Sequence, residues 1–283
     1  MIKIITDSCS DIVGNQRKDL IILPITITFG SNEFQDGINL SHQEFYEKLI
    51  ESDELPVTSQ IPPAVFEEAY EATAREGDEA IVITISSKLS GTYQSANIGA
   101  ENHRGRIFIV DSENASLGER ILVEYALRLK DQGLSVGEIV EKLERAKKNI
   151  RLIALLDTLE YLKKGGRISK AAAVAGGLLS IKPVIAVQGG EVAVLGKARG
   201  SKQGNNLLAE EIARANGVDY DMPFVLAYTG LSDAVIQKYI DDHENLWKGI
   251  VERPTPASVG GAIGTHIGPG AIGIAFFAVS NNV

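Results

Sequence analysis

Two short segments combine hydroxyl side chains with a predicted helix start: Thr58 and Ser59 in one, and Ser90, Gly91 and Thr92 in the other. A helix start offers unpaired N–H groups and a partial positive charge, which suit an anionic oxygen. Each hydroxyl taken alone more often caps its helix. Two such segments in one chain nevertheless favour a shared anion site.

A basic segment lies at residues 163–170, with the sequence KKGGRISK. Four of its eight residues are Lys or Arg, although the whole chain has a net charge of −9. Such a cluster is usually a solvated face of the protein. The glycine pair directly before Arg167, however, predicts a turn that presents the guanidinium, and Arg199 adds a second guanidinium further along the chain. Arginine is suited to bidentate contact with a carboxylate or a phosphate.

One histidine lies among closely spaced glycines, in the stretch GTHIGPGAIG at residues 264–273. The imidazole of His266 can donate to an anion, act as a general acid or base, or satisfy the local backbone, and the last role is the commonest. The other three histidines are scattered and none has metal-ligand spacing, so no metal site is expected. The single cysteine, Cys9, excludes an internal disulfide.

The motifs of several enzyme classes are absent from the sequence. It contains no G-x-S-x-G nucleophile elbow, no G-x-x-x-x-G-K-[ST] phosphate loop and no G-x-G-x-x-G that opens a helix after a strand. Two alternatives stay open on the residues alone. One is an acyl hydrolase or transferase that uses Ser90 with His266. The other is a nucleotide- or phosphate-binding regulator.

The composition is that of a soluble globular protein. The chain has 283 residues, 44% of them hydrophobic, with 28 basic against 37 acidic side chains. An acidic surface repels phosphate, which disfavours a general nucleic-acid binder. The N-terminus lacks the regions of a signal peptide, and the longest apolar runs, 171–187 and 271–279, are interrupted or too short to cross a bilayer. We therefore expect a cytoplasmic protein without an integral membrane segment.

Short apolar runs alternate with amphipathic stretches, which predicts an α/β fold. In the first half the predicted strands are 2–5, 80–85 and 107–110, and the predicted helices are 41–51, 65–75, about 93–102, 117–130 and 136–148. This β-loop-α repetition predicts a mostly parallel sheet with flanking helices. Residues 21–29 are expected to form an edge strand or a small separate sheet, and residues 34–40 a turn.

The second half has a different pattern. Gly189 and Gly190 separate the apolar runs 183–187 and 191–195, which predicts a hairpin and hence a mixed or antiparallel sheet. Other predicted elements are the strands 152–156, 224–228, 249–252 and 272–279 and the helices 171–179, 205–215 and 234–241. The change of pattern places a domain boundary near residue 150, which divides the chain into 1–150 and 151–283.

Several of these segments, taken in order, resemble the DegV family. They are ITDS at 5–8, TSQ at 58–60, SSKLSGTYQ at 86–94, GGRIS at 165–169, IKP at 181–183, KARG at 197–200, and His266 with the glycines after it. The resemblance runs from about residue 4 to 276, nearly the whole chain. One departure is the proline pair 62–63, since many members place proline directly after the glutamine of the TSQ segment.

The resemblance implies a bacterial fatty-acid-binding protein whose two α/β domains, 1–150 and 151–283, enclose the acyl chain. In the best understood members, called FakB, the protein presents the fatty acid to a separate kinase subunit. That partner forms an acyl phosphate for phospholipid synthesis, while the binding protein performs no chemistry and needs no cofactor.

The resemblance also implies roles for particular residues. Thr58, Ser90 and His266 would bind the fatty-acid carboxylate. Ser59, Gly91 and Thr92 would shape the mouth of the pocket. Arg167 and Arg199 would face the head group or the kinase.

Overall fold

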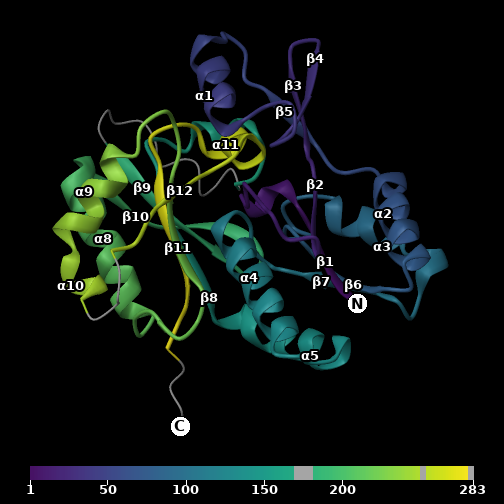
Figure 1. Ribbon diagram of the computed structural model, residues 1–283. Helices are drawn as coiled ribbons and strands as arrows, with labels where there is room; N and C mark the ends of the chain where they lie inside the picture. The colour runs from purple at the N-terminus through teal and green to yellow at the C-terminus, as the bar shows by residue number, and fades with distance from the viewer. Residues whose placement is uncertain (169–180, 249–252, 280–283) are drawn as a thin grey trace.

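The computed structural model describes residues 1–168, 181–248 and 253–279, and its path is drawn in Figure 1. The helix predicted at 171–179 and the strand predicted at 249–252 lie outside these ranges. The remaining predicted elements fall within them and are compared with the structure below.

The first half forms a four-stranded sheet in the order β2-β1-β6-β7, and every neighbouring pair in it is parallel. Its strands are β1 (Ile2–Asp7), β2 (Leu20–Leu23), β6 (Glu79–Thr84) and β7 (Ile107–Asp111). Its helices are α2 (Pro63–Arg75), α3 (Thr92–Gly99), α4 (Leu117–Asp131) and α5 (Val136–Ala146). Helices α2 and α3 pack together on one face, and α4 and α5 on the other (Figure 1). The predicted parallel sheet is confirmed.

The second half forms a six-stranded mixed sheet in the order β10-β9-β8-β13-β11-β12. Its strands are β8 (Ile150–Leu155), β9 (Ile181–Gln188), β10 (Glu191–Arg199), β11 (Phe224–Tyr228), β12 (Ala257–Ser258) and β13 (Ile272–Phe277). Neighbours are antiparallel except β11 and β12, and β9 and β10 form the predicted hairpin. Helices α8 (Gly200–Arg214), α9 (Ala234–Asp242) and α10 (Glu244–Trp247) lie on its outer side (Figure 1).

A small antiparallel sheet and short helices complete the fold. The sheet has the order β4-β3-β5, with β3 (Thr26–Phe29), β4 (Asn32–Gln35) and β5 (Val57–Ser59). The helices are α1 (His42–Glu51), α6 (Glu160–Lys164) and α11 (Gly261–Ile267), with 3-10 turns at Ser8–Ser10, Glu101–His103 and Lys147–Asn149. Helix α11 contacts α1, β3 and β5. This contact places a C-terminal helix against the small N-terminal sheet.

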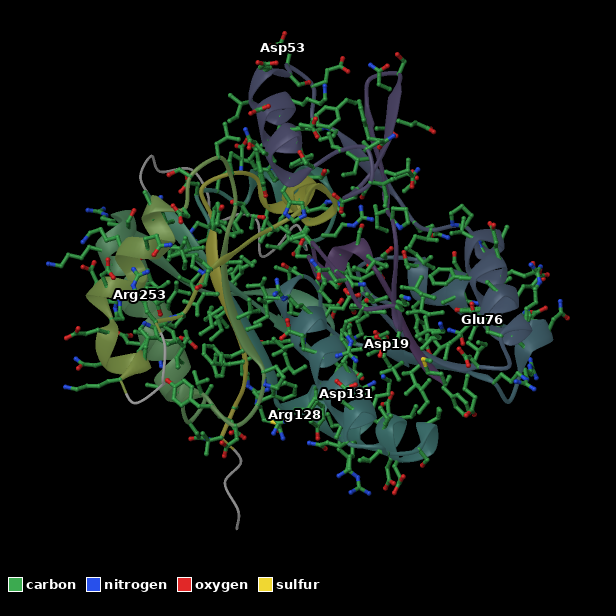
Figure 2. The ribbon with its side chains drawn as sticks, viewed as in Figure 1. Asp19, Asp53, Glu76, Arg128, Asp131 and Arg253 are labelled. Carbon is green, nitrogen blue, oxygen red and sulfur yellow. The ribbon has the colours of Figure 1, made fainter. Side chains whose placement is uncertain are left out.

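Helix α4 joins the two larger sheets. It contacts β1 and β6 of the parallel sheet and β8, β11 and β13 of the mixed sheet, and one continuous apolar cluster includes buried residues of both. At its far end Arg17 Nη2 lies 2.8 Å from Asp19 Oδ2 and 2.7 Å from Asp131 Oδ1, while Arg128 donates to the carbonyl of Asp221 (Figure 2). Helix α4 is thus held by apolar contacts along its length and by polar contacts at its exposed C-terminal end.

Two local predictions are wrong. Residues 32–35, partly expected as a turn, form strand β4. Thr58 and Ser59 do not stand at a helix start but lie in strand β5, where Thr58 pairs with Ile27 and which residues 60–62 separate from helix α2. The reason is the proline pair at 62–63, because a residue before proline is driven to extended backbone and the helix cannot reach back over the hydroxyls.

Candidate functional site

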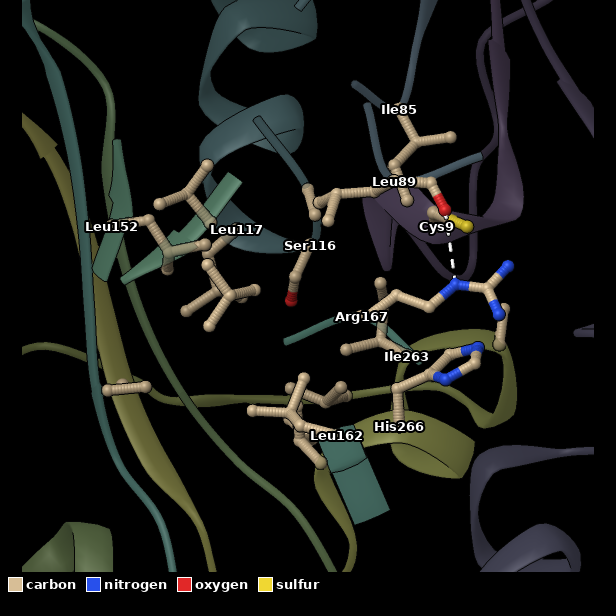
Figure 3. A pocket seen from close by; sticks show the side chains of 18 of the residues that line it. Cys9, Ile85, Leu89, Ser116, Leu117, Leu152, Leu162, Arg167, Ile263 and His266 are labelled. Atoms are coloured by element: carbon tan, nitrogen blue, oxygen red, sulfur yellow. Dashed lines mark hydrogen bonds between the residues drawn. The ribbon is translucent and has the colours of Figure 1, made fainter. Parts of the chain in front are cut away.

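A cavity of about 280 Å³ lies between the two larger sheets and is lined mainly by apolar side chains. One wall comes from the carboxyl end of the parallel sheet, where Cys9 and Ile85 follow β1 and β6. The opposite wall comes from the mixed sheet, which contributes Leu152, Ile185 and Val187 among others (Figure 3). Ligands of open parallel sheets usually bind outside the carboxyl ends of the strands, and the cavity has that position.

Polar groups gather at one end of this cavity. Thr58 Oγ1 lies 2.9 Å from His266 Nε2, so a residue of the small sheet meets a residue of α11. Ser90 Oγ lies 2.9 Å from Thr92 Oγ1 and accepts the Thr92 N–H at 3.2 Å, directly before α3 begins. Thr58, Ser90 and His266 all line the cavity. Hydroxyl donors, an imidazole and the start of α3 therefore converge on one region.

Arg167 borders the same polar end. Its Nε donates to the carbonyl of Leu89 at 3.2 Å, and its Nη1 donates to the carbonyl of Gly165 at 2.6 Å (Figure 3). Because Leu89 directly precedes Ser90, the guanidinium fixes the hydroxyl segment against the turn after α6. The glycine turn predicted before Arg167 is present, with Gly166 at a φ of 70°, a conformation that favours glycine.

The imidazole of His266 is held in a neutral form. Burial, followed by the nearby positive charge of Arg167, lowers its pKa to about 4. Nδ1 is buried without a hydrogen-bond partner among the described residues, and a Cβ added at Gly165 would lie 2.3 Å from it. An unpaired buried N–H is costly, so we assign the single proton to Nε2. His266 then donates to Thr58, whose own hydroxyl proton is free to point into the cavity.

Two buried carboxylates anchor the helix that contains His266. Asp11 accepts the N–H of Gly260 at 2.7 Å, and Asp36 accepts the N–H groups of Gly261 and Ala262 at 3.0 and 3.3 Å. These N–H groups stand at the start of α11, where a helix has no partners of its own for them. Burial raises the pKa of Asp11 to about 7 and also raises that of Asp36. The carboxylates position the imidazole through the helix.

A third buried carboxylate anchors the segment that contains Ser90. Asp7, at the end of β1, accepts the N–H of Cys9 at 3.0 Å and the N–H of Ile85 at 2.9 Å. This contact joins the ends of two neighbouring strands just before residues 86–92. Burial raises the pKa of Asp7 to about 6. The position of Asp7 at a strand end can be predicted from the sequence. Its hydrogen bond to the N–H of Ile85 cannot.

The structure brings together most of the residues singled out from the sequence. Ser59 and Gly91 line the cavity beside Thr58 and Ser90, while Thr92 is buried behind Ser90 and is not part of the wall. Arg199 is exposed at the end of β10, donates its backbone N–H to Gln203 Oε1, and does not line the cavity. Gln60 was missed and does line it, with its Nε2 donating to Ser95 Oγ at 3.0 Å.

The arrangement bears on the alternative functions. The Nε2 atom of His266 is hydrogen-bonded to Thr58, and the Ser90 hydroxyl to Thr92, so these contacts do not form a serine–histidine pair. Among residues 1–168, 181–248 and 253–279, no three His, Cys, Asp or Glu side chains group closely enough to hold a metal ion. No helix within the same ranges is long and apolar enough to cross a membrane.

The chain is similar over nearly its whole length to known DegV proteins. A DegV domain-containing protein of Caldanaerobacter subterraneus is 34% identical over 280 residues, which cover 97% of this chain and 98% of that protein. A fatty-acid-binding DegV family protein of Thermus thermophilus has a solved structure with a TM-score of 0.87 and 32% identity, covering 98% of this chain and 99% of that one. The Fak B3 protein of the Streptococcus pneumoniae fatty acid kinase, loaded with linoleic acid, has a TM-score of 0.86 and 25% identity, covering 99% and 100%.

The family model described as an uncharacterised protein of the DegV family matches residues 1–279. The match spans the parallel sheet, the mixed sheet and every polar residue of the cavity. The α/β architecture is also that of the fatty-acid-binding DegV structures. The chain belongs to the DegV family.

Proposed function

We propose that this protein binds a long-chain fatty acid in the cavity and presents its carboxylate to a separate fatty acid kinase. The observation that supports this most is an apolar cavity with hydrogen-bond donors gathered at one end. Solved relatives from Thermus thermophilus and Streptococcus pneumoniae bind fatty acids. In this proposal the units 1–150 and 151–283 each supply one wall.

The apolar wall accounts for the affinity. About 14 buried methylenes at roughly 0.8 kcal/mol each contribute about 11 kcal/mol before association and ordering costs. This term alone is large enough for tight binding. The head group then needs to orient the ligand and to avoid the cost of an unpaired carboxylate.

The polar end accounts for the orientation. Thr58 donates the proton that His266 leaves free, and Ser90 donates from the start of α3, so each carboxylate oxygen has a hydroxyl partner. His266 acts through Thr58, and Ser59 and Gly91 shape the surrounding mouth. Thr92 does not line the mouth as expected but lies behind Ser90, with the two hydroxyl oxygens 2.9 Å apart. A neutral imidazole and two hydroxyls hold the carboxylate without a permanent ion pair, which leaves an oxygen lone pair accessible to a kinase.

In this proposal Arg167 and Arg199 have different binding partners. Arg167 stands at the polar end and meets the phosphorylated head group, for which its guanidinium geometry is suited. Arg199 is exposed and away from the cavity, and we assign it to contact with the kinase. The protein itself then needs no catalytic group and no cofactor.

Mass spectrometry of the purified protein under native conditions tests the proposal. We expect a co-purified mass of a long-chain fatty acid, its loss on delipidation, and recovery of the complex when a long-chain acid is added back. Binding also raises the melting temperature, because the ligand binds only the folded state. A delipidated, folded protein that takes up no fatty acid would refute it.

A further inference from the structure

A second cavity of about 490 Å³ lies beyond the end of the first one. Its wall includes apolar side chains of the mixed sheet and of the end of α8: Ile150, Leu152, Ile153, Val187, Leu195 and Ala215. Charged side chains stand among the other lining residues, with Lys147 Nζ 3.1 Å from Glu113 Oε1. The second cavity is therefore lined by both apolar and polar side chains, and the charged ones are Glu113, Lys147, Lys148, Arg151, Glu211 and Arg214.

The two cavities share a wall. Leu152, Ala186 and Val187 line both of them. The loop before α4 also passes from one to the other, since Glu113 and Asn114 line the second cavity and residues 115–117 line the first. Three separate segments thus contribute to the walls of both cavities.

The pairing of strands β8 and β9 stops before it reaches this shared wall, the partition. The register between β8 and β9 pairs Ile153, Ala154 and Leu155 with their partners and ends at the pair of Ile153 with Ala186. The next residues, Leu152 and Val187, have no partner in that register. An aliphatic chain can pass such a point without breaking a ladder hydrogen bond.

The partition lies at the end of the first cavity that is remote from the polar groups. Figure 3 places Leu117 and Leu152 on the side opposite to Arg167 and His266. A fatty acid whose carboxylate is held at the polar end therefore directs its methyl end toward Leu152. At about 280 Å³ the first cavity is also at the lower limit of ordinary ligand pockets, which begin near roughly 300 Å³.

We propose that the second cavity receives the methyl end of acyl chains too long for the first one, past Leu152 and Val187, which line both cavities. This inference rests on the proposed fatty-acid function and adds a chain-length determinant to it. Each methylene that leaves water strengthens binding about fourfold. Long chains consequently keep gaining affinity only while the second cavity is free.

The test fills the second cavity without touching the first. Leu195 and Ala215 line only the second cavity, so Leu195→Phe and Ala215→Phe are made separately. Delipidated proteins are titrated with tetradecanoic, hexadecanoic, octadecanoic, eicosanoic and docosanoic acid. We expect both variants to bind tetradecanoic acid as the parent protein does and to bind docosanoic acid at least about tenfold more weakly. Val235→Phe, at an exposed valine of α9 that lines neither cavity, is the matched control.

A variant of the partition tests the same point in the opposite direction. Leu152→Ala removes part of a side chain that lines both cavities, and we expect its preference for docosanoic over tetradecanoic acid to rise at least about fourfold. The same chain-length profile in the parent protein and both filling variants would overturn the inference. An equal loss of affinity for acids of every chain length in both filling variants would also overturn it. A parent protein that binds none of the acids would instead contradict the proposed function itself.

Discussion

Removing the hydroxyls of Thr58 and Ser90 together weakens fatty-acid binding roughly 100-fold. The expectation follows from the chemistry of the head group, because a hydrogen bond to a charged group contributes about 1.5–3 kcal/mol and the buried carboxylate loses two of them. Thr58→Val keeps the shape of the side chain, and Ser90→Ala removes the hydroxyl together with the hydrogen bond that it accepts from the Thr92 N–H. Each single variant is expected to lose about tenfold. Calorimetric titration of the delipidated proteins with a long-chain fatty acid measures the effect.

A neighbouring serine provides the control for the double variant. Ser87 lies in the same loop as Ser90 but is exposed and does not line the cavity. Ser87→Ala should bind fatty acid as the parent protein does. If the double variant also kept the parent affinity while remaining folded, the carboxylate would have to lie elsewhere.

Replacing Arg167 with alanine lowers phosphorylation of the bound fatty acid by the kinase about 30- to 100-fold. The basis is the lost charge-assisted contact of a guanidinium with a phosphate, together with the loss of the hydrogen bonds that fix this side chain against Leu89 and Gly165. The rate is measured at saturating fatty acid, so that weaker binding does not contribute. The dissociation constant itself is expected to change only about threefold.

Two further arginine variants separate the possible roles. Arg167→Lys keeps the positive charge but not the planar fork, and should restore only part of the rate. Arg199→Ala should raise the kinase concentration needed for half-maximal rate and leave fatty-acid affinity unchanged, because Arg199 is exposed and outside the cavity. An Arg167→Ala protein that no longer bound fatty acid would assign this side chain to the carboxylate.

The sheets could be predicted from the sequence because their strands are nearly continuous apolar runs. The apolar run at 80–85 is buried throughout and covers β6 from its second residue to the residue after it. Gly189 and Gly190 lie at the turn of the hairpin formed by β9 and β10. Local chemistry also indicated the Ser90 segment correctly. The prediction of a helix start was wrong at Thr58, because the prolines 62–63 keep the preceding residues extended and the hydroxyl belongs to strand β5.

The contacts that complete the site could not be predicted from local patterns. Thr58 and His266 are 208 positions apart, and their hydrogen bond depends on how α11 packs against the small sheet. Asp36 has the local sequence of an ordinary turn, yet it is 3% exposed and accepts N–H groups of that helix. Gly165 was expected to shape a turn, and its lack of a side chain also leaves room for the imidazole. Each of these depends on packing between distant elements.

The most direct measurement is a crystal structure of this protein with a long-chain fatty acid bound. We expect carboxylate oxygens within about 3 Å of Thr58 Oγ1 and Ser90 Oγ. The acyl chain should run from there between the two larger sheets toward Leu152. A chain bound in the reverse direction, with its methyl end at Thr58 and Ser90, or a ligand bound outside this cavity, would contradict the proposal.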